Sequence, residues 1–81
     1  MKLGKNLRVK DIKLIYNQFN LYLKNNTELK VYLHEVDTID ISGLALLLEF
    51  KCLATQVHKP IQFIDTPDCI YKLCELYQVN L

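Results

Sequence analysis

Residues 29–57 read LKVYLHEVDTIDISGLALLLEFKCLATQV. Apolar and polar residues alternate from Leu29 to Val36, and this period of two predicts a strand. The segment Leu44–Val57 is too long and too rich in leucine and alanine for a strand, so it predicts a helix that begins near Ser42. Residues 37–40 form a polar connection between these two elements.

The flanking segments repeat this order of strand and helix. Residues 3–9 predict a short strand, and Asp11 then stands where an N-cap opens a helix with apolar residues every three or four positions. Residues 61–64 predict a third strand, and Thr66 is the expected N-cap of a last helix with Pro67 in its first turn. The order β-α-β-α-β-α predicts one α/β domain over residues 1–81, with a mainly parallel sheet and helices packed on it.

Composition excludes several classes of protein. A chain of 81 residues buries only roughly 60–65% of its unfolded surface, so its core is small. Ten Lys and Arg are balanced by nine Asp and Glu, which argues against nucleic-acid binding. No segment approaches the ~20 apolar residues that span a bilayer, so we expect a cytoplasmic protein without direct membrane insertion.

Three cysteines, Cys52, Cys69 and Cys74, form an odd set without a C-x-x-C pair. This argues against a disulfide framework and against a structural zinc site. We expect all three to be small core residues.

Four aspartates follow the second and third predicted strands: Asp37, Asp40, Asp65 and Asp68. They could converge as a magnesium site, but aspartates at strand-to-helix junctions are more often helix caps, and we favour caps. His34 and His58 have no triad spacing and are interpreted as surface residues. With no phosphate-binding glycine motif either, we expect no catalytic residue, cofactor or metal.

The helix after Ser42 carries more apolar surface than a small sheet needs. Its broad stripe, suited to the core, consists of Leu46, Leu47, Phe50, Leu53, Ala54 and Val57. A second, narrower stripe consists of Leu44, Leu48 and Cys52. An exposed apolar patch marks a protein contact, but the last helix could equally cover this stripe. Ser42 itself is a good N-cap, and physical chemistry alone favours that role over a phosphate site.

Residues 36–48 resemble the signature of STAS domains, in which a strand leads through D-S-S-G or D-[ST]-A-G into an apolar helix. The similarity continues through Ile61–Phe63 and the segment 67–77. The helix start G-L-A-L-L-L and the final I-Y-x-L-x-x-L-Y are similar to MlaB-like proteins, the cytoplasmic STAS subunits of bacterial ABC transporters that maintain outer-membrane phospholipid asymmetry.

This resemblance implies a non-catalytic subunit that binds and supports the ABC transporter ATPase, with the membrane permease contacted only indirectly. The protein would then lie peripheral to the inner membrane through its partner complex. The implied partner-binding residues are Asp40, Ile41, Ser42, Gly43, Leu44 and Leu48.

Two departures from the family pattern leave alternatives open. MlaB-like proteins place a hydroxyl residue where this chain has Ile41, whereas Ser42 coincides with the serine that is phosphorylated in anti-sigma-factor antagonists. The alternative is therefore a switch that binds an anti-sigma serine kinase and is released by phosphorylation of Ser42. The chain also has little room for a further N-terminal strand, so an open sheet edge predicts pairing through that edge, including a homodimer.

Overall fold

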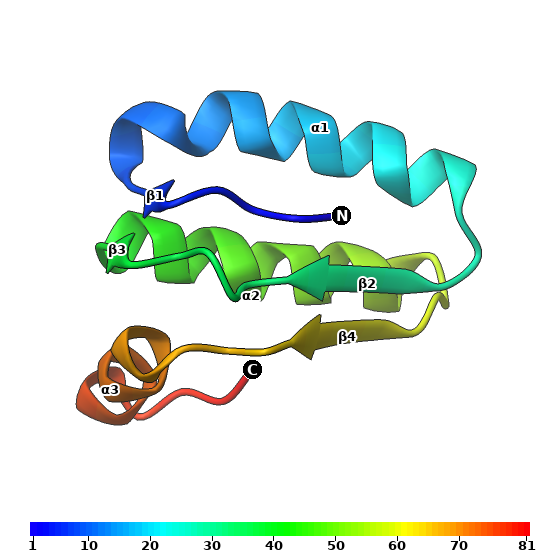
Figure 1. Cartoon of the computed structure of the whole chain (residues 1–81). Coiled ribbons are helices and arrows are strands. Elements are labelled where there is room, and N and C mark those ends of the chain that lie inside the picture. The colour runs from blue at the N-terminus through cyan, green and yellow to red at the C-terminus, as the bar shows by residue number, and fades with distance from the viewer.

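The computed structural model describes residues 1–81 and confirms a small α/β fold with parallel strands (Figure 1). The helices are α1 (Ile12–Asn25), α2 (Ile41–Gln56) and α3 (Asp68–Tyr77). The strands are β1 (Asn6–Leu7), β2 (Leu29–Tyr32), β3 (Thr38–Ile39) and β4 (Ile61–Ile64). None of the helices has the length and apolar character needed to cross a membrane.

The strands form two parallel pairs, β1 with β3 and β2 with β4. The first residues of the chain connect these pairs, because the Leu3 N–H donates to the Tyr32 carbonyl at 3.1 Å and the Tyr32 N–H donates to the Met1 carbonyl at 2.8 Å. Residues 1–7 therefore run beside residues 29–39, and β4 lies on the other side of β2.

The predicted strand over residues 29–36 is wrong in its second half. The chain turns after Tyr32, with the Val36 N–H donating to the Leu33 carbonyl, and pairing resumes as β3. Leu33 and Val36 are both buried, so the apolar pattern gave no sign of the turn. The first predicted strand is also shorter than expected, because Val9 lies in a 3-10 helix over Val9–Asp11 and is 67% exposed.

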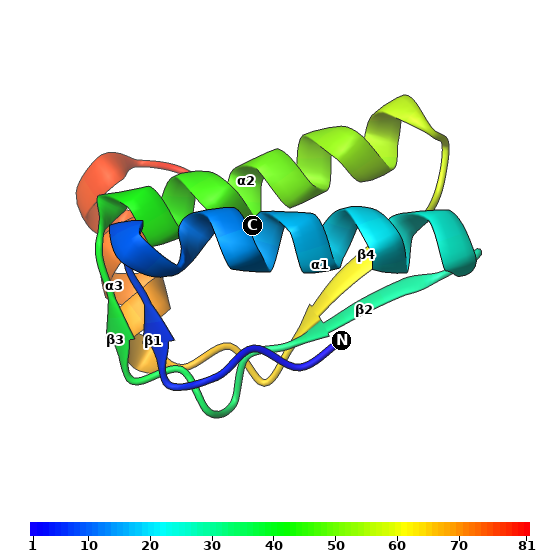
Figure 2. The ribbon, with the colours of Figure 1, turned by 90° about the horizontal axis from the view of Figure 1, so that it is seen from above.

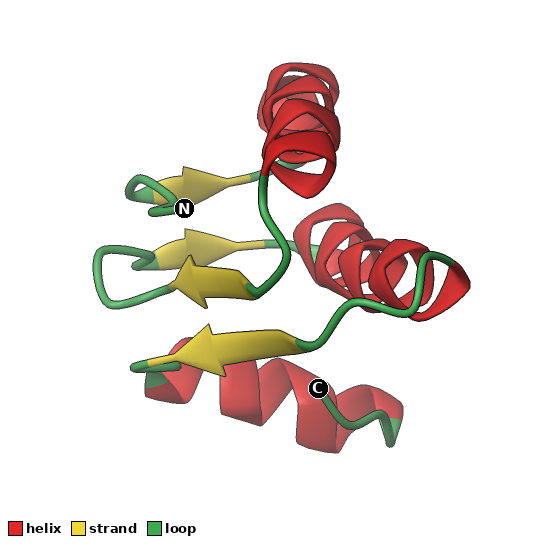
Figure 3. Cartoon of the chain, turned by 90° about the vertical axis from the view of Figure 1, so that its right-hand side faces the viewer, coloured by secondary structure: helices red, strands yellow, loops and turns green.

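Both long helices, α1 and α2, lie on the same face of the strands, and the opposite face has no helix over it (Figures 2 and 3). On β2 this arrangement buries Leu29 and Val31 on the helix side and leaves Lys30 exposed. Burial of the apolar surface between the two layers is the main stabilising contribution. At its centre, the Phe19 ring of α1 stacks on Phe50 of α2 with centroids 3.9 Å apart.

One predicted helix cap is confirmed in position and another is wrong. Asp11 occupies the N-cap position of α1 as predicted, although its side chain makes no capping hydrogen bond. At α3 the N-cap is Pro67 rather than Thr66, because Pro67 has an extended backbone (φ −75°, ψ 163°) and the helix begins after it. Asp68 instead lies in the first turn, where its charge interacts favourably with the helix dipole.

Candidate docking surface on the second helix

Asp40 joins the start of α2 to the segment that follows β1. One carboxylate oxygen accepts a hydrogen bond from the Gly43 N–H at 3.0 Å, and the other accepts from the Val9 N–H at 3.2 Å. The expectation that Asp40 caps this helix is confirmed. Because both oxygens are used inside the chain, Asp40 holds the surface in place and has limited capacity to bind a partner.

Gly43 lies where α2 approaches the strands most closely. A Cβ atom on this residue would stand 2.2 Å from the Leu7 carbonyl oxygen and 2.9 Å from Cγ1 of Ile39. Glycine therefore allows α2 to pack directly against β1 and β3. Gly43 is buried, so it cannot contact a partner as the resemblance implied.

Leu44 is only 1% exposed, so for this residue the alternative that the stripe is covered within the fold is the correct one. The helix packs against both α1 and α3, and apolar side chains on several of its sides are needed inside the fold. Burial of Leu44 within the chain removes it from the predicted contact residues.

An exposed stripe does exist on α2, and it keeps Leu48 and Cys52 of the predicted stripe but has Ile41 and Ala45 in place of Leu44. We call it the outer stripe, and it consists of Ile41, Ala45, Leu48 and Cys52. Ile41 is 48% exposed, Ala45 and Cys52 are exposed, and Leu48 is half-buried. Spacings of four, three and four residues align these side chains along the helix. The sequence contained a sign of this stripe. If Asp40 is the N-cap, Ile41 is the first helical residue and lies on the same side of the helix as Ala45 and Leu48.

No helix or strand covers the side of α2 that faces away from the strands (Figures 2 and 3). An open hollow of about 490 Å³ lies there, and its lining includes Leu48, Lys51, Cys52 and Asn80. The C-terminal half of the outer stripe therefore lines this shallow hollow, whereas its N-terminal half ends at Ile41.

Ser42 lies half-buried in the first turn of α2. Its hydroxyl makes no hydrogen bond within the chain, and the cap is Asp40, so the interpretation of Ser42 as a simple N-cap is wrong. Backbone N–H groups of a first helical turn favour an added negative charge. Because the Ser42 hydroxyl makes no hydrogen bond, it is not needed to hold the fold together.

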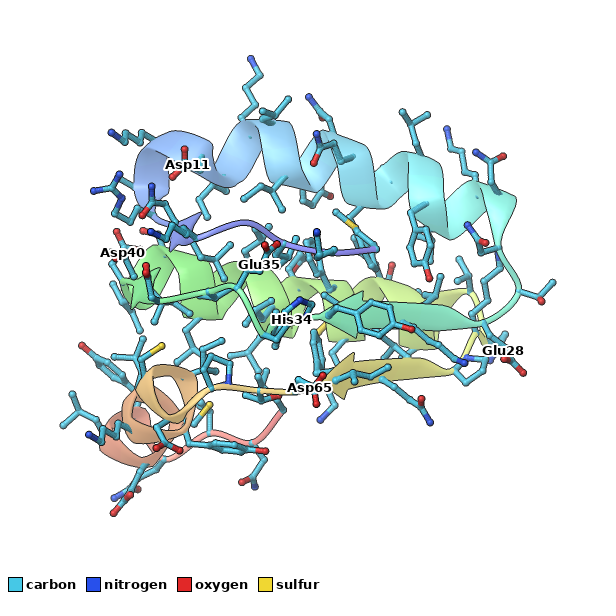
Figure 4. The ribbon with its side chains drawn as sticks, in the orientation of Figure 1. Asp11, Glu28, His34, Glu35, Asp40 and Asp65 are labelled. Atoms are coloured by element: carbon cyan, nitrogen blue, oxygen red, sulfur yellow. The ribbon has the colours of Figure 1, made fainter.

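Polar atoms without partners lie in the segment that Asp40 binds. The Arg8 Nε and one carboxylate oxygen of Asp11 are buried without a hydrogen bond. Asp11 and Asp40 lie at the same end of the molecule (Figure 4). Buried polar groups normally have partners, so these two atoms lower the stability of this end of the fold. Because neither atom is accessible, they do not form part of a contact surface.

The remaining predicted site residues are dispersed. Asp37 is within 3.9 Å of the Lys5 ammonium, Asp65 is exposed after β4, and Asp68 lies at α3. No three metal-binding side chains converge. His34 and His58 are exposed, as expected.

The cysteines have three different environments. Cys74 is buried, as expected, and its burial raises the pKa of the thiol. Cys69 is partly buried, whereas Cys52 is exposed on the outer stripe, so the prediction that Cys52 is a core residue is wrong.

The outer stripe has the chemistry of a contact surface: apolar side chains on a rigid helix, with a cation at the edge of the hollow. Its residues include no paired nucleophile and base. A comparison of the sequence with protein-family models and with curated proteins finds no match.

Proposed function

We propose that this protein is a STAS-like, non-catalytic subunit that docks through the outer stripe onto the ATPase of an ABC transporter for phospholipids. The observation that supports the proposal best is the exposure of Ile41 and Ala45 at the start of a helix that Asp40 and Gly43 fix against the strands. Apolar side chains on a rigid helix are suited to binding in a groove of a partner.

The resemblance and the geometry indicate the same part of α2 but not all the same residues. Four of the six residues that the resemblance implies are at least partly accessible: Asp40, Ile41, Ser42 and Leu48. Ala45 and Cys52 join them on the outer stripe.

The test is an affinity purification of the tagged protein from its native cells in mild detergent, with the bound proteins identified by mass spectrometry. We expect recovery of an ABC ATPase together with a membrane permease. The double variant Ile41→Asp/Ala45→Glu should lose the ATPase, because two carboxylates would be buried at the interface without partners.

The matched control is Leu14→Glu/Leu21→Asp, which makes the same change of charge on α1 at two exposed leucines. It should recover the ATPase as well as the unmodified chain does. Equal recovery by all three folded proteins would show that the outer stripe is not the docking surface.

The second candidate function is an anti-sigma-factor antagonist regulated at Ser42. It is favoured by the Ser42 hydroxyl, which lies in the first turn of α2 without a hydrogen bond and adjoins the outer stripe. Phosphorylation there would add nearly two negative charges and disfavour an apolar contact. The same purification would then recover a soluble serine kinase and a Ser42 phosphopeptide, and Ser42→Ala would retain the kinase while Ser42→Asp would lose it.

A further inference from the structure

The strand β4 has a free edge. Its partner β2 bonds to alternate residues, since the Leu29 N–H donates to the Pro60 carbonyl and the Leu33 N–H donates to the Ile64 carbonyl, both at 2.9 Å. In this parallel register the N–H and C=O groups of Ile61 and Phe63 point to the other side. No other group of the chain bonds to them, and α3 lies beyond the C-terminal end of the strand (Figure 1).

A cavity of about 290 Å³ adjoins this edge on the side of β4 that faces the helices. Its wall contains the side chains of Ile61 and Phe63, together with Cys74, Val79 and Leu81. Ile61 and Phe63 are only partly buried, so they leave apolar surface uncovered at the same residues whose backbone groups are unpaired.

We infer that the β4 edge and this cavity together bind an extended segment of a partner protein, which adds as a further strand of the sheet. In strand addition, backbone hydrogen bonds provide affinity, here to Ile61 and Phe63. Pockets that accept every second side chain of the added strand provide specificity. Residues aligned with Ile61 and Phe63 would enter the cavity and should be apolar. Residues between them would lie beside the exposed Gln62 and should be polar.

The positive charge of Lys51 at the cavity indicates which charge the partner segment should carry. Lys51 lines the wall, and its ammonium has no carboxylate within ion-pairing distance. The added segment should therefore carry an aspartate or glutamate near Lys51. A second copy of this chain fits less well, because it would bring another Lys51 to the same seam and like charges there are unfavourable.

The test begins with selection of a displayed library of random nine-residue peptides on the intact protein. We expect enrichment of peptides that alternate apolar and polar residues and contain an acidic residue. Synthetic copies of the enriched peptides should slow hydrogen exchange at the Ile61 and Phe63 amides, which the free protein leaves unprotected. Lys51→Glu should change the selected charge from acidic to basic.

A backbone change provides the decisive control. The chain can be assembled by ligation at Cys52, with a synthetic segment 52–81 that carries an N-methyl group on Phe63. The methyl group removes a donor that β2 does not use, so the fold should remain while peptide affinity falls at least tenfold relative to the chain ligated without it. The docking variant Ile41→Asp/Ala45→Glu should bind the peptides normally.

Three outcomes would overturn the inference. These are no enrichment of alternating peptides, equal peptide binding by the folded N-methyl chain, and a dimer of the free protein in sedimentation that protects the Phe63 amide. The last result would make a second copy the occupant of the edge.

Discussion

On its inner side α2 places Leu47, Phe50 and Ala54 entirely within the core, whereas on its outer side Ile41 and Ala45 are exposed to solvent. The residue types on the two sides are similar, so composition alone does not distinguish them. Packing does distinguish them: neighbouring elements cover the inner side, and no helix or strand covers the outer side (Figure 3). Substitutions on the two sides of α2 should accordingly have very different effects on folding.

The largest effect is expected from Leu44→Asp. Leu44 is buried, and a carboxylate there would lose hydration without gaining a partner, which should destabilise the fold by more than about 4 kcal/mol. Urea unfolding followed by circular dichroism should show a largely unfolded protein. A folded Leu44→Asp variant would mean that this part of α2 opens to solvent, contrary to the structure.

Gly43→Ala should have the next largest effect. Alanine favours a helix interior over glycine by about 1 kcal/mol, but its Cβ would lie 2.2 Å from the backbone oxygen of Leu7. Because backbone must move to relieve this contact, we expect a net loss of about 1–3 kcal/mol in the free energy of unfolding.

Gly4→Ala is the matched control, since no atom lies within 4 Å of the position its Cβ would take. Its unfolding midpoint in urea should stay close to that of the unmodified chain. Equal midpoints for Gly4→Ala and Gly43→Ala would refute the close approach of α2 to β1.

The Asp40 cap should contribute less than the packing at Gly43. Asp40→Ala removes hydrogen bonds to two N–H groups, and we expect a loss of about 1–2 kcal/mol in urea unfolding. Asp68→Ala changes an aspartate in the first turn of α3 that makes no capping bond, so it should cost less. A larger loss of unfolding free energy in Asp68→Ala than in Asp40→Ala would contradict the conclusion that the Asp40 cap stabilises the fold more.

These comparisons also show how far sequence patterns reach. Periodicity predicted α2 to begin near Ser42, and the helix begins at Ile41. Ile41 is therefore a helical residue and joins the outer stripe, whereas Leu44 is buried. Whether an apolar helical residue is covered depends on how α1 and α3 pack, and the spacing of residues along one helix carries no such information.

The break between β2 and β3 could not be predicted for a similar reason. The turn keeps Leu33 and Val36 buried, so hydrophobic alternation looks continuous across it. The carbonyl of Lys5 accepts from both Asp37 and Thr38, and this contact is distant in sequence. By contrast, the bounds of β4 agreed with the prediction, since His58, Lys59 and Pro60 separate it clearly from α2.

Cysteine chemistry should separate the exposed side of α2 from the interior. Cys52 should react rapidly with iodoacetamide and Cys74 slowly, because Cys74 is buried and burial raises the pKa of its thiol. Because the pKa of Cys74 is higher in the folded than in the unfolded chain, the contribution of this thiol to stability is fully present below the unfolded pKa of about 9. It is lost as the pH rises through the folded pKa, because the unfolded chain then releases the thiol proton more readily. Mass spectrometry of alkylated peptides should show equal rates at both sites in urea; equal rates in the folded protein would contradict the burial of Cys74.

The smallest effect on stability is expected from Ile41→Asp, on the side of α2 opposite to the core. Ile41 is 48% exposed, and an aspartate in the first turn interacts favourably with the helix dipole. The free energy of unfolding should change by no more than about 0.5 kcal/mol, within the range of surface substitutions. Urea unfolding of Ile41→Asp and Leu44→Asp side by side is therefore the sharpest test of the comparison. If both variants unfold, Ile41 belongs to the core and the outer stripe is not a free surface; if only Leu44→Asp unfolds, any loss of partner binding in Ile41→Asp arises at the interface itself.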